Sequence, residues 1–327
     1  MDRSVPTTLR RDREWARRLT RFFSKTAAKV PEAEAPVPEP APRRGLKISR
    51  SRSEAFFLSV ASGKGGTGKS FFATNLAVAM CSQHRRVTLV DCDFGMANDH
   101  LLLGVNPSKS IQHFFAGTAS LEHVRVHTRF GPDLLPGGSG ISRLGDLSEV
   151  ELLRFGQGLS TIAHETDVMV MDAAAGISPQ SVLTLLAAQH VVIVTNPEIA
   201  ALTDAYALVK CISSHPGHAE ISVVVNRVAT HAQGEATFDK LADVSTRFSN
   251  CEIHYLGAIP EEPAVSHHRL NQPPLVVSHP SCHASQAIFG ILSRLEQQVG
   301  IGQLLVSATD TVEHRFKKNL SRHRRNR

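Results

Sequence analysis

Residues 62–70 read Ser-Gly-Lys-Gly-Gly-Thr-Gly-Lys-Ser, and the rest of the chain is organised around them. The apolar run at residues 55–61 precedes them and predicts a buried strand, while residues 71–80 contain good helix formers and no helix breaker. From Gly63 to Ser70 the sequence fits the phosphate-loop pattern G-x-x-x-x-G-K-[ST]. A strand before this pattern and a helix after it are the structural context in which a phosphate loop occurs. The stretch therefore predicts a loop that cradles the phosphates of a nucleotide.

The residue types of this loop indicate its chemistry. Glycines allow backbone angles that a side chain would forbid, and they let the backbone approach a ligand closely. The N–H groups of the loop and of the helix that follows are then expected to point at phosphate oxygens. We expect Lys69 to contact the β- and γ-phosphates and Ser70 to hold Mg²⁺. The nucleotide-binding residues predicted in the loop are Gly63, Gly65, Gly66, Thr67, Gly68, Lys69 and Ser70.

Four further apolar runs predict buried strands, and helical segments lie between them. The runs cover residues 87–90, 167–172, 190–195 and 221–226, with helical segments at 203–213 and 235–248. Continuous apolar strands that alternate with helices are typical of a parallel sheet that is covered on both faces. We therefore expect an α/β fold with a doubly wound, mostly parallel sheet and helices on both faces.

Acidic residues stand at the carboxyl ends of two predicted strands, the edge at which open parallel sheets bind ligands. Phosphate transfer to water needs Mg²⁺, a clamp that neutralises charge and a positioned nucleophile. We expect Asp172 to link the metal to the γ-phosphate, and Asp91 to support the ligand shell of the metal, so the predicted metal site is Ser70, Asp91 and Asp172. Asp93 is the candidate for orienting or activating the attacking water. The alternative for Asp91 and Asp93 is a capping or solvated loop acid.

Lys64 is a residue that an ordinary phosphate loop does not require. A second lysine adds positive charge where one lysine is enough for the bound phosphates. Lys64 is therefore either a solvated loop lysine or a residue that faces the nucleotide of another subunit.

Residues 64–70 resemble the deviant phosphate loop of the MinD/ParA ATPases, P-loop NTPases of the SIMIBI class. Two later segments, at residues 91–93 and 172–176, are similar to the two switch segments of that family. The resemblance implies an ATPase that uses ATP and Mg²⁺, hydrolyses ATP slowly and forms a homodimer when ATP is bound. It also implies that Lys64 reaches the phosphates of the partner subunit. The catalytic residues expected on this basis are Lys64, Lys69 and Asp93.

The residues Asn226 and Arg227 end a predicted strand and resemble the Val-Asn-Arg segment with which this family contacts adenine. The same resemblance places Pro260 at the base. An N/T-K-x-D motif, which reads guanine, is not visible at this position. The expected nucleotide is therefore ATP.

Several segments resemble one branch of the family, the flagellar-number regulators called FlhG, FleN or YlxH. The most specific is residues 197–210, and the match extends over residues 54–299. The resemblance implies a switch that regulates flagellar number or placement. The alternatives are a MinD-like division-site regulator, a ParA-like segregation ATPase and an adaptor that binds ATP without significant hydrolysis. His100 stands where the family usually has Asp, so this switch segment is expected to differ from the usual one.

Charge divides the chain into an acidic body and two basic ends. Residues 1–53 carry 14 Lys or Arg and 6 Asp or Glu, residues 315–327 carry seven basic and no acidic residues, and residues 54–314 have a net charge of −9. An acidic body argues against DNA binding by the folded part, so we expect anionic partners to bind at the two basic ends. The predicted organisation is a basic N-terminal segment at 1–29, a proline-rich linker at 30–53, the P-loop domain at 54–299 and a basic tail at 300–327.

The tails provide the candidate docking segments. Residues 1–29 are either a basic tail, a helix that docks on a partner protein or a membrane-surface helix. The pattern of residues 300–327 predicts an amphipathic basic helix. This helix would either bind a membrane surface, remain in solvent or contact nucleic acid. By resemblance, a candidate protein partner is an FlhF-like GTPase or a flagellar switch or regulatory protein. The chain has no apolar run long enough to cross a bilayer and no secretory signal, so we expect a cytoplasmic protein, with peripheral attachment to the inner face of the membrane as an option.

Overall fold

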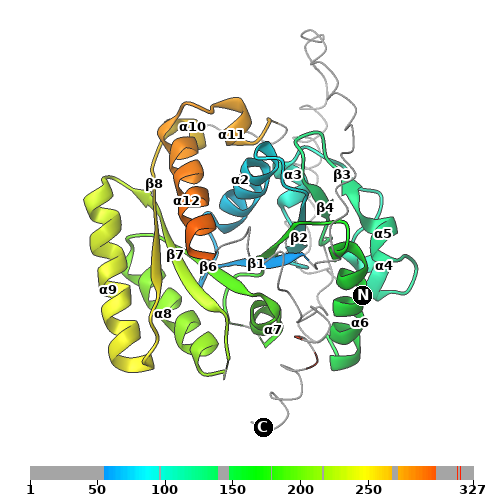
Figure 1. Cartoon of the computed structure of the whole chain (residues 1–327), viewed down its shortest axis with the longest axis horizontal. Helices are drawn as coiled ribbons and strands as arrows, with labels where there is room; N and C mark the ends of the chain where they lie inside the picture. Colours follow the sequence, from blue (N-terminus) through cyan, green and yellow to red (C-terminus); the bar gives the residue numbers. More distant parts are fainter. Residues whose placement is uncertain are drawn as a thin grey trace, which may run out of the picture. The chain divides into compact units, whose positions relative to one another are not determined.

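The sheet at the centre of the molecule contains eight strands among the residues that the structure describes. The computed structural model describes residues 55–95, 97–138, 147–177, 179–215, 217–266, 272–299, 315 and 317. The strands lie in the order β3-β4-β2-β5-β1-β6-β7-β8, and all neighbours are parallel except the pair β3 and β4 (Figure 1). Their bounds are β1 (Phe56–Ala61), β2 (Val87–Cys92), β3 (Val126–His127), β4 (Asp133–Leu135), β5 (Val168–Ala173), β6 (His190–Thr195), β7 (Glu220–Val228) and β8 (His254–Pro260).

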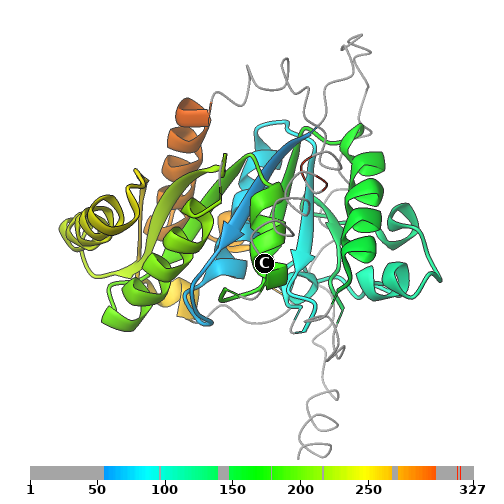
Figure 2. The same ribbon diagram turned by 90° about the horizontal axis from the view of Figure 1, so that it is seen from below.

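Helices cover both faces of this sheet. Figures 1 and 2 show α2 and α12 on one side of it and α6, α7 and α8 on the other. The bounds of the helices are α2 (Lys69–Ser82), α3 (Asp99–Leu102), α4 (Ile111–Phe115), α5 (Leu121–Val124), α6 (Glu149–Ala163), α7 (Pro179–Ala187), α8 (Ile199–Ser213), α9 (His231–Ser249), α10 (Pro263–Ser266), α11 (Leu275–Ser278) and α12 (His283–Val299). The expected doubly wound α/β fold is confirmed.

Successive side chains of β1 point to opposite faces, as a strand requires. Phe56 and Leu58 belong to the core that packs under α2 and α12, whereas Phe57 belongs to the core under α6. All three side chains are at most 2% exposed, and burying each stabilises the fold by about 1.5–3 kcal/mol. The unbroken apolar run at residues 55–61 is explained by this burial on both sides.

Strand order brings the predicted acids together. β5 lies between β1 and β2, so Asp172 on β5 stands in register with Asp91 on β2 and with Val60 on β1. The carboxyl end of β1 leads directly into residues 62–68 and then into α2. The phosphate loop and two predicted metal residues therefore meet at one edge of the sheet.

The structure adds elements that the apolar pattern does not predict. β3 and β4 are two and three residues long, too short for a pattern to be visible. β8 contains Gly257 at φ +135°, and the register of β7 with β8 shifts beside it, which interrupts the strand pattern. α8 and α9 begin four residues earlier than the predicted helical segments. The predicted N-terminal segment, the linker and all of the C-terminal tail except residues 315 and 317 lie outside the described residues.

Within the described residues, the helices are all too short or too polar to cross a membrane. The five cysteines lie in the same described part of the chain, and no disulfide joins any two of them.

Candidate nucleotide-binding site

The loop between β1 and α2 is held open by its glycines. Gly66 and Gly68 have φ values of +81° and +92°, in the left-handed region that favours glycine. Gly65 and Gly66 are exposed, and a Cβ atom added to either would meet no atom within 4 Å. The Thr67 hydroxyl is buried and has no hydrogen-bond partner among the described residues. An open cradle with an unpartnered polar atom is what a ligand rich in oxygen atoms would fill.

Three side chains form a buried network at the start of α2. Lys69 Nζ donates to Asp172 Oδ1 at 2.7 Å, and Ser70 Oγ donates to Asp172 Oδ2 at 2.6 Å. Lys69 and Asp172 are 6% and 1% exposed. Burial alone lowers the pKa of Lys69, but the charge of Asp172 and its hydrogen bond outweigh burial, so the pKa is raised above its ordinary value. Lys69 is therefore a cation held ready beside the loop.

Asp91 is fixed by backbone groups of the segment that follows β2. Its carboxylate accepts hydrogen bonds from the N–H groups of Asp93 at 3.0 Å, Asn98 at 3.1 Å and Asp99 at 3.3 Å. Burial, followed by the charge of Asp172, raises the pKa of Asp91 to about 7. Asp91 thus holds the residues that follow β2 against the edge of the sheet where the metal site is predicted.

Asp93 is half-buried at the end of β2, beside the network. Its charge contributes to the raised pKa of Asp172, which places the two carboxylates within electrostatic reach of each other. The predicted role of Asp93 on the attacking water stays a prediction.

Asp99 is a buried acid at this edge to which the sequence reasoning assigned no role. It is 0% exposed and accepts a hydrogen bond from Thr74 Oγ1 at 3.2 Å. One carboxylate oxygen each from Asp91, Asp99 and Asp172 lies within 4.8 Å of the others. The sequence offered one signal, because Asp99 directly precedes His100, the position at which the family pattern is broken.

Lys64 does not join this network. Its Nζ donates to Glu198 Oε2 at 2.6 Å, and the two side chains are 30% and 60% exposed. Glu198 is the residue that precedes α8. The two lysines of the loop therefore have different acidic partners. Lys69 pairs with the buried Asp172 on β5, and Lys64 pairs with the exposed Glu198 just before α8. Glu198 lay within the family-like segment at 197–210, but its pairing with Lys64 was not predicted.

The loop also rests directly on α8 at Gly63. A Cβ atom at Gly63 would lie 2.3 Å from the carbonyl carbon and oxygen of Asp204, whereas one at Gly65 would meet open space. Because backbone atoms cannot move aside cheaply, we expect Gly63→Ala to lower the free energy of unfolding by about 1–3 kcal/mol. Gly65→Ala is the matched control and should change it by less than about 0.5 kcal/mol. Urea unfolding measures both, and equal effects would contradict the close contact.

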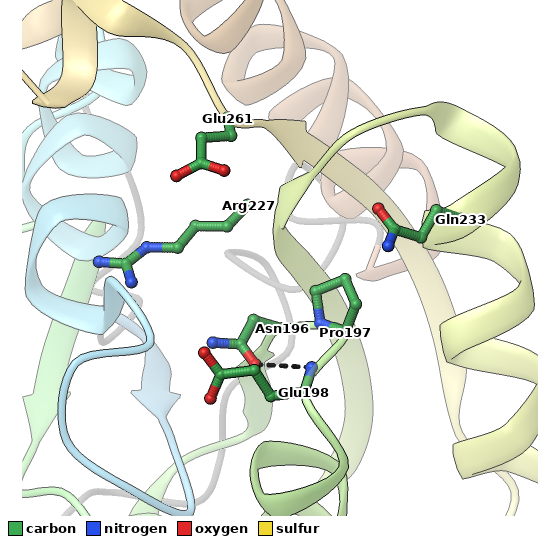
Figure 3. A pocket seen from close by; sticks show the side chains of 6 residues that line it. All are labelled: Asn196, Pro197, Glu198, Arg227, Gln233 and Glu261. Atoms are coloured by element: carbon green, nitrogen blue, oxygen red, sulfur yellow. Dashed lines mark hydrogen bonds between the residues drawn. The ribbon is translucent and has the colours of Figure 1, made fainter.

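A cavity of about 350 Å³ is lined by residues that follow β6, by one residue each of β7 and α9, and by the residue that follows β8 (Figure 3). Its lining residues are Asn196, Pro197, Glu198, Arg227, Gln233 and Glu261. Figure 3 shows the Arg227 side chain reaching across toward the loop and α2, and Arg227 has a left-handed backbone at φ +56°. Asn196 Oδ1 accepts the N–H of Glu198 at 3.1 Å, which shapes the turn into α8.

The three predicted base residues take different positions around this cavity. Arg227 lines it. Asn226 is buried, and its Nδ2 donates to the Thr67 carbonyl at 2.8 Å, so this side chain connects β7 to the phosphate loop. Pro260 ends β8 just before Glu261, which lines the cavity although Pro260 does not. Asn196 and Glu261 were missed, although both directly follow strand ends; Gln233 stands on α9 and gave no signal.

This donor set fits a nucleotide with Mg²⁺. The ammonium of Lys69 and the free N–H groups at the start of α2 suit phosphate oxygens. The Ser70 hydroxyl and the carboxylates of Asp91 and Asp172 are oxygen ligands of the kind that Mg²⁺ takes. The cavity at the ends of β6, β7 and β8 is lined by Arg227, one of the three residues predicted to contact the base.

Comparisons with known proteins agree with this geometry. Residues 58–275 match the CobQ/CobB/MinD/ParA nucleotide binding domain. The chain is 33% identical to the antiactivator FleN of Pseudomonas aeruginosa over 239 residues, which are 73% of this chain and 85% of that protein. It is 36% identical to the flagellum site-determining protein YlxH of Helicobacter pylori over 204 residues, 62% of this chain and 69% of that protein. Among solved structures, the septum site-determining protein MinD of Pyrococcus horikoshii, complexed with Mg-ADP, is 28% identical with a TM-score of 0.64, covering 76% of this chain and 98% of that one.

Proposed function

The chain belongs to the CobQ/CobB/MinD/ParA nucleotide-binding family, and on this premise we propose that it is an ATP-dependent dimerising switch that regulates flagellar number or placement. The chain is a P-loop ATPase of the MinD/ParA type that uses ATP and Mg²⁺. The proposal adds that ATP binding joins two copies and that slow hydrolysis separates them.

The observation that carries the proposal is the position of Lys64. A lysine in the phosphate loop whose ammonium binds Glu198, rather than the buried acids beside Lys69, is available to a nucleotide outside its own cradle. Glu198 is 60% exposed, so this ion pair contributes little stability and separates easily. Lys64 can therefore exchange Glu198 for the phosphates of a second copy.

The surface around Lys64 supports a second copy as the partner. Ile199 follows Glu198 and is 83% exposed, and Ile177 is 52% exposed. Ile177 directly follows the second switch-like segment, whose Gly176 N–H donates to the Ser62 carbonyl at 2.9 Å beside the loop. A second copy that docked on the loop would cover both of these exposed apolar side chains. If this face becomes a contact surface only when ATP is bound, ATP binding drives the pairing of two copies.

Each residue of the site has a role in the proposed reaction. Lys69 leaves Asp172 for the β- and γ-phosphates, and the N–H groups of the loop hold the remaining phosphate oxygens. Bound Mg²⁺ would be held by Ser70, with Asp91 and Asp172 supporting it, and would neutralise charge that develops on the phosphates. Asp93 orients the attacking water, while Arg227 and Asn226 position the base with Pro260 beside them.

The flagellar role rests on the resemblance of this sequence to the flagellar-number regulators and on the relative named flagellum site-determining protein YlxH. A flagellar regulatory protein or an FlhF-like GTPase is the partner class we propose, and the basic tails are the proposed docking segments, at the cytoplasmic face of the membrane. A MinD-like role at the division septum is the second candidate, favoured by the structural likeness to the septum protein MinD.

Replacing Lys64 tests the proposal. We expect Lys64→Ala to abolish the ATP-dependent dimer while nucleotide binding to the monomer remains, because Lys69 still holds the phosphates. Light scattering after size-exclusion chromatography measures the dimer, and fluorescent ATP binding measures the site. In the source organism, flagellar counts should change on deletion of the gene and should not be restored by the Lys64→Ala variant.

The matched control is Glu198→Gln, which removes the resting ion pair and leaves Lys64 in place. It should dimerise with ATP at least as well as the unaltered chain. Dimers of undiminished amount in Lys64→Ala would contradict the shared site. Unchanged flagellar counts in the deletion strain, with altered septum placement, would favour the second candidate.

A further inference from the structure

Three carboxylates lie together beneath the phosphate loop. Asp91, Asp99 and Asp172 are each at most 1% exposed, and one oxygen from each lies within 4.8 Å of the other two. They come from the end of β2, the start of α3 and the end of β5. A cluster of acids is common on a surface, but here all three are in the interior.

Asp99 differs from its two neighbours in how its oxygens are used. Both oxygens of Asp172 accept hydrogen bonds from α2, and both oxygens of Asp91 accept backbone N–H groups. Asp99 Oδ1 accepts only from Thr74, and Asp99 Oδ2 has no hydrogen-bond partner among the described residues. A fully buried carboxylate oxygen without a donor costs free energy unless something binds it.

In the described part of the chain, side chains do not balance the charges of the cluster. Within that part, Lys69 contacts the cluster through Asp172, and it offers one positive charge against three carboxyl groups. Burial therefore favours either protons on these carboxyl groups or an added cation. The unpartnered oxygen on Asp99 favours a cation, because this buried oxygen still lacks a partner and the Asp99 carboxylate belongs to the cluster.

The spacing suits a hard divalent cation. Oxygens on opposite sides of an ion lie twice the metal–oxygen distance apart, about 4.1 Å for Mg²⁺ and about 4.6–5.2 Å for Ca²⁺. A spread of up to 4.8 Å lies in this range, with a small closure needed for the smaller ion. Water molecules would complete the coordination, as is usual for these ions.

We propose that Asp91, Asp99 and Asp172 bind a divalent cation in the nucleotide-free protein, with Lys69 competing for Asp172. The inference rests on the proposed function in one respect, because it assumes that ATP binds at the loop. The cation would then be bound before ATP, and would not enter the site as part of Mg-ATP. Asp99 is the residue that distinguishes this site from one made by Ser70, Asp91 and Asp172 around a bound nucleotide.

Manganese is the probe, because free Mn²⁺ is counted directly by electron paramagnetic resonance. The full chain, freed of nucleotide, should bind one Mn²⁺ more tightly than about 1 mM, the weak limit of carboxylate sites. Asp99→Asn should weaken that affinity by about tenfold or more. Asp239→Asn, which alters an exposed acid on α9, is the matched control and should leave it unchanged. Lys69→Ala should tighten it, because the competing ammonium is gone.

Binding of no Mn²⁺ up to about 1 mM, or equal affinity in Asp99→Asn, would overturn the inference. Thermal melting establishes that the variant is folded, and Asp99→Ser replaces it if Asp99→Asn is not. Binding of fluorescent ATP in the presence of Mg²⁺ separates this inference from the proposed function. Normal Mg-ATP binding, in a chain that binds no Mn²⁺ when free of nucleotide, refutes the cation site alone, whereas absence of Mg-ATP binding by the unaltered chain refutes the nucleotide site.

Discussion

Lys69→Ala is expected to reduce ATP turnover by about 100-fold or more. The lysine supplies the positive charge that a P-loop enzyme places on the β- and γ-phosphates, and a preorganised charge of this kind acts most strongly in a site that excludes water. Lys69 is 6% exposed and already charged, so its removal deletes a prepared group that water cannot replace. Phosphate release from Mg-ATP measures the effect.

The same substitution leaves Asp172 buried without its ion-pair partner. Breaking a buried pair in this way typically costs about 3–5 kcal/mol, less whatever Asp172 recovers by taking up a proton. The double variant Lys69→Ala with Asp172→Asn removes both charges and should recover much of the lost melting temperature, but none of the turnover. Turnover restored with stability would mean that Lys69 acts only as a structural partner of Asp172.

The phosphate loop and the fold around it could be predicted because the signal is local. Residues 55–80 specify a strand, a turn and a helix in succession, and each part depends on neighbours in the sequence. Gly68 and Lys69 form the start of α2 as the pattern requires, with Gly68 left-handed at the N-cap. The strand and the helix on either side of the loop could therefore be predicted from these residues alone, without information from the rest of the chain.

The assembly of the acids could be predicted only in part. That Asp91 and Asp172 end strands is visible in the sequence, but their adjacency depends on β5 lying between β1 and β2. Asp99 stands on a four-residue helix, and its burial follows from the way Asp91 holds the preceding backbone. No local pattern reports such a contact, so an acid one position from the expected one was passed over.

The residues at the cavity lined by Arg227 could also be predicted only in part. Asn226 was predicted as a base contact because it resembles part of the family's Val-Asn-Arg segment, and in the structure its Nδ2 donates to the Thr67 carbonyl. That hydrogen bond uses the Nδ2 of Asn226 and not its Oδ1, so it does not by itself exclude a contact with a base. The glutamate at position 261 and the glutamine at position 233 come from elements whose approach is set by tertiary packing.

Asp93→Asn is expected to lower turnover by about 100-fold or more while ATP-dependent dimers persist. A side chain that orients or deprotonates the attacking water typically contributes about 10²–10⁴ in rate. The amide keeps the size of the carboxylate and leaves the Asp93 N–H bonded to Asp91, so the switch segment should hold its shape. Single-turnover ATP hydrolysis measures the chemical step, and light scattering measures the dimer.

The persistence of the dimer is what makes this prediction specific. Lys64, the residue proposed to join two copies, is bound to Glu198 at the start of α8, on the opposite side of β1 from the strand that carries Asp93. Asp93→Asn should therefore accumulate ATP-bound dimers that Lys64→Ala cannot form, and the double variant should be monomeric. If Asp93→Asn hydrolysed ATP at the unaltered rate, the attacking water would have to be positioned by another group, and Asp172 would be the first to examine. If it were inactive and monomeric, the first switch segment would be part of the dimer interface itself.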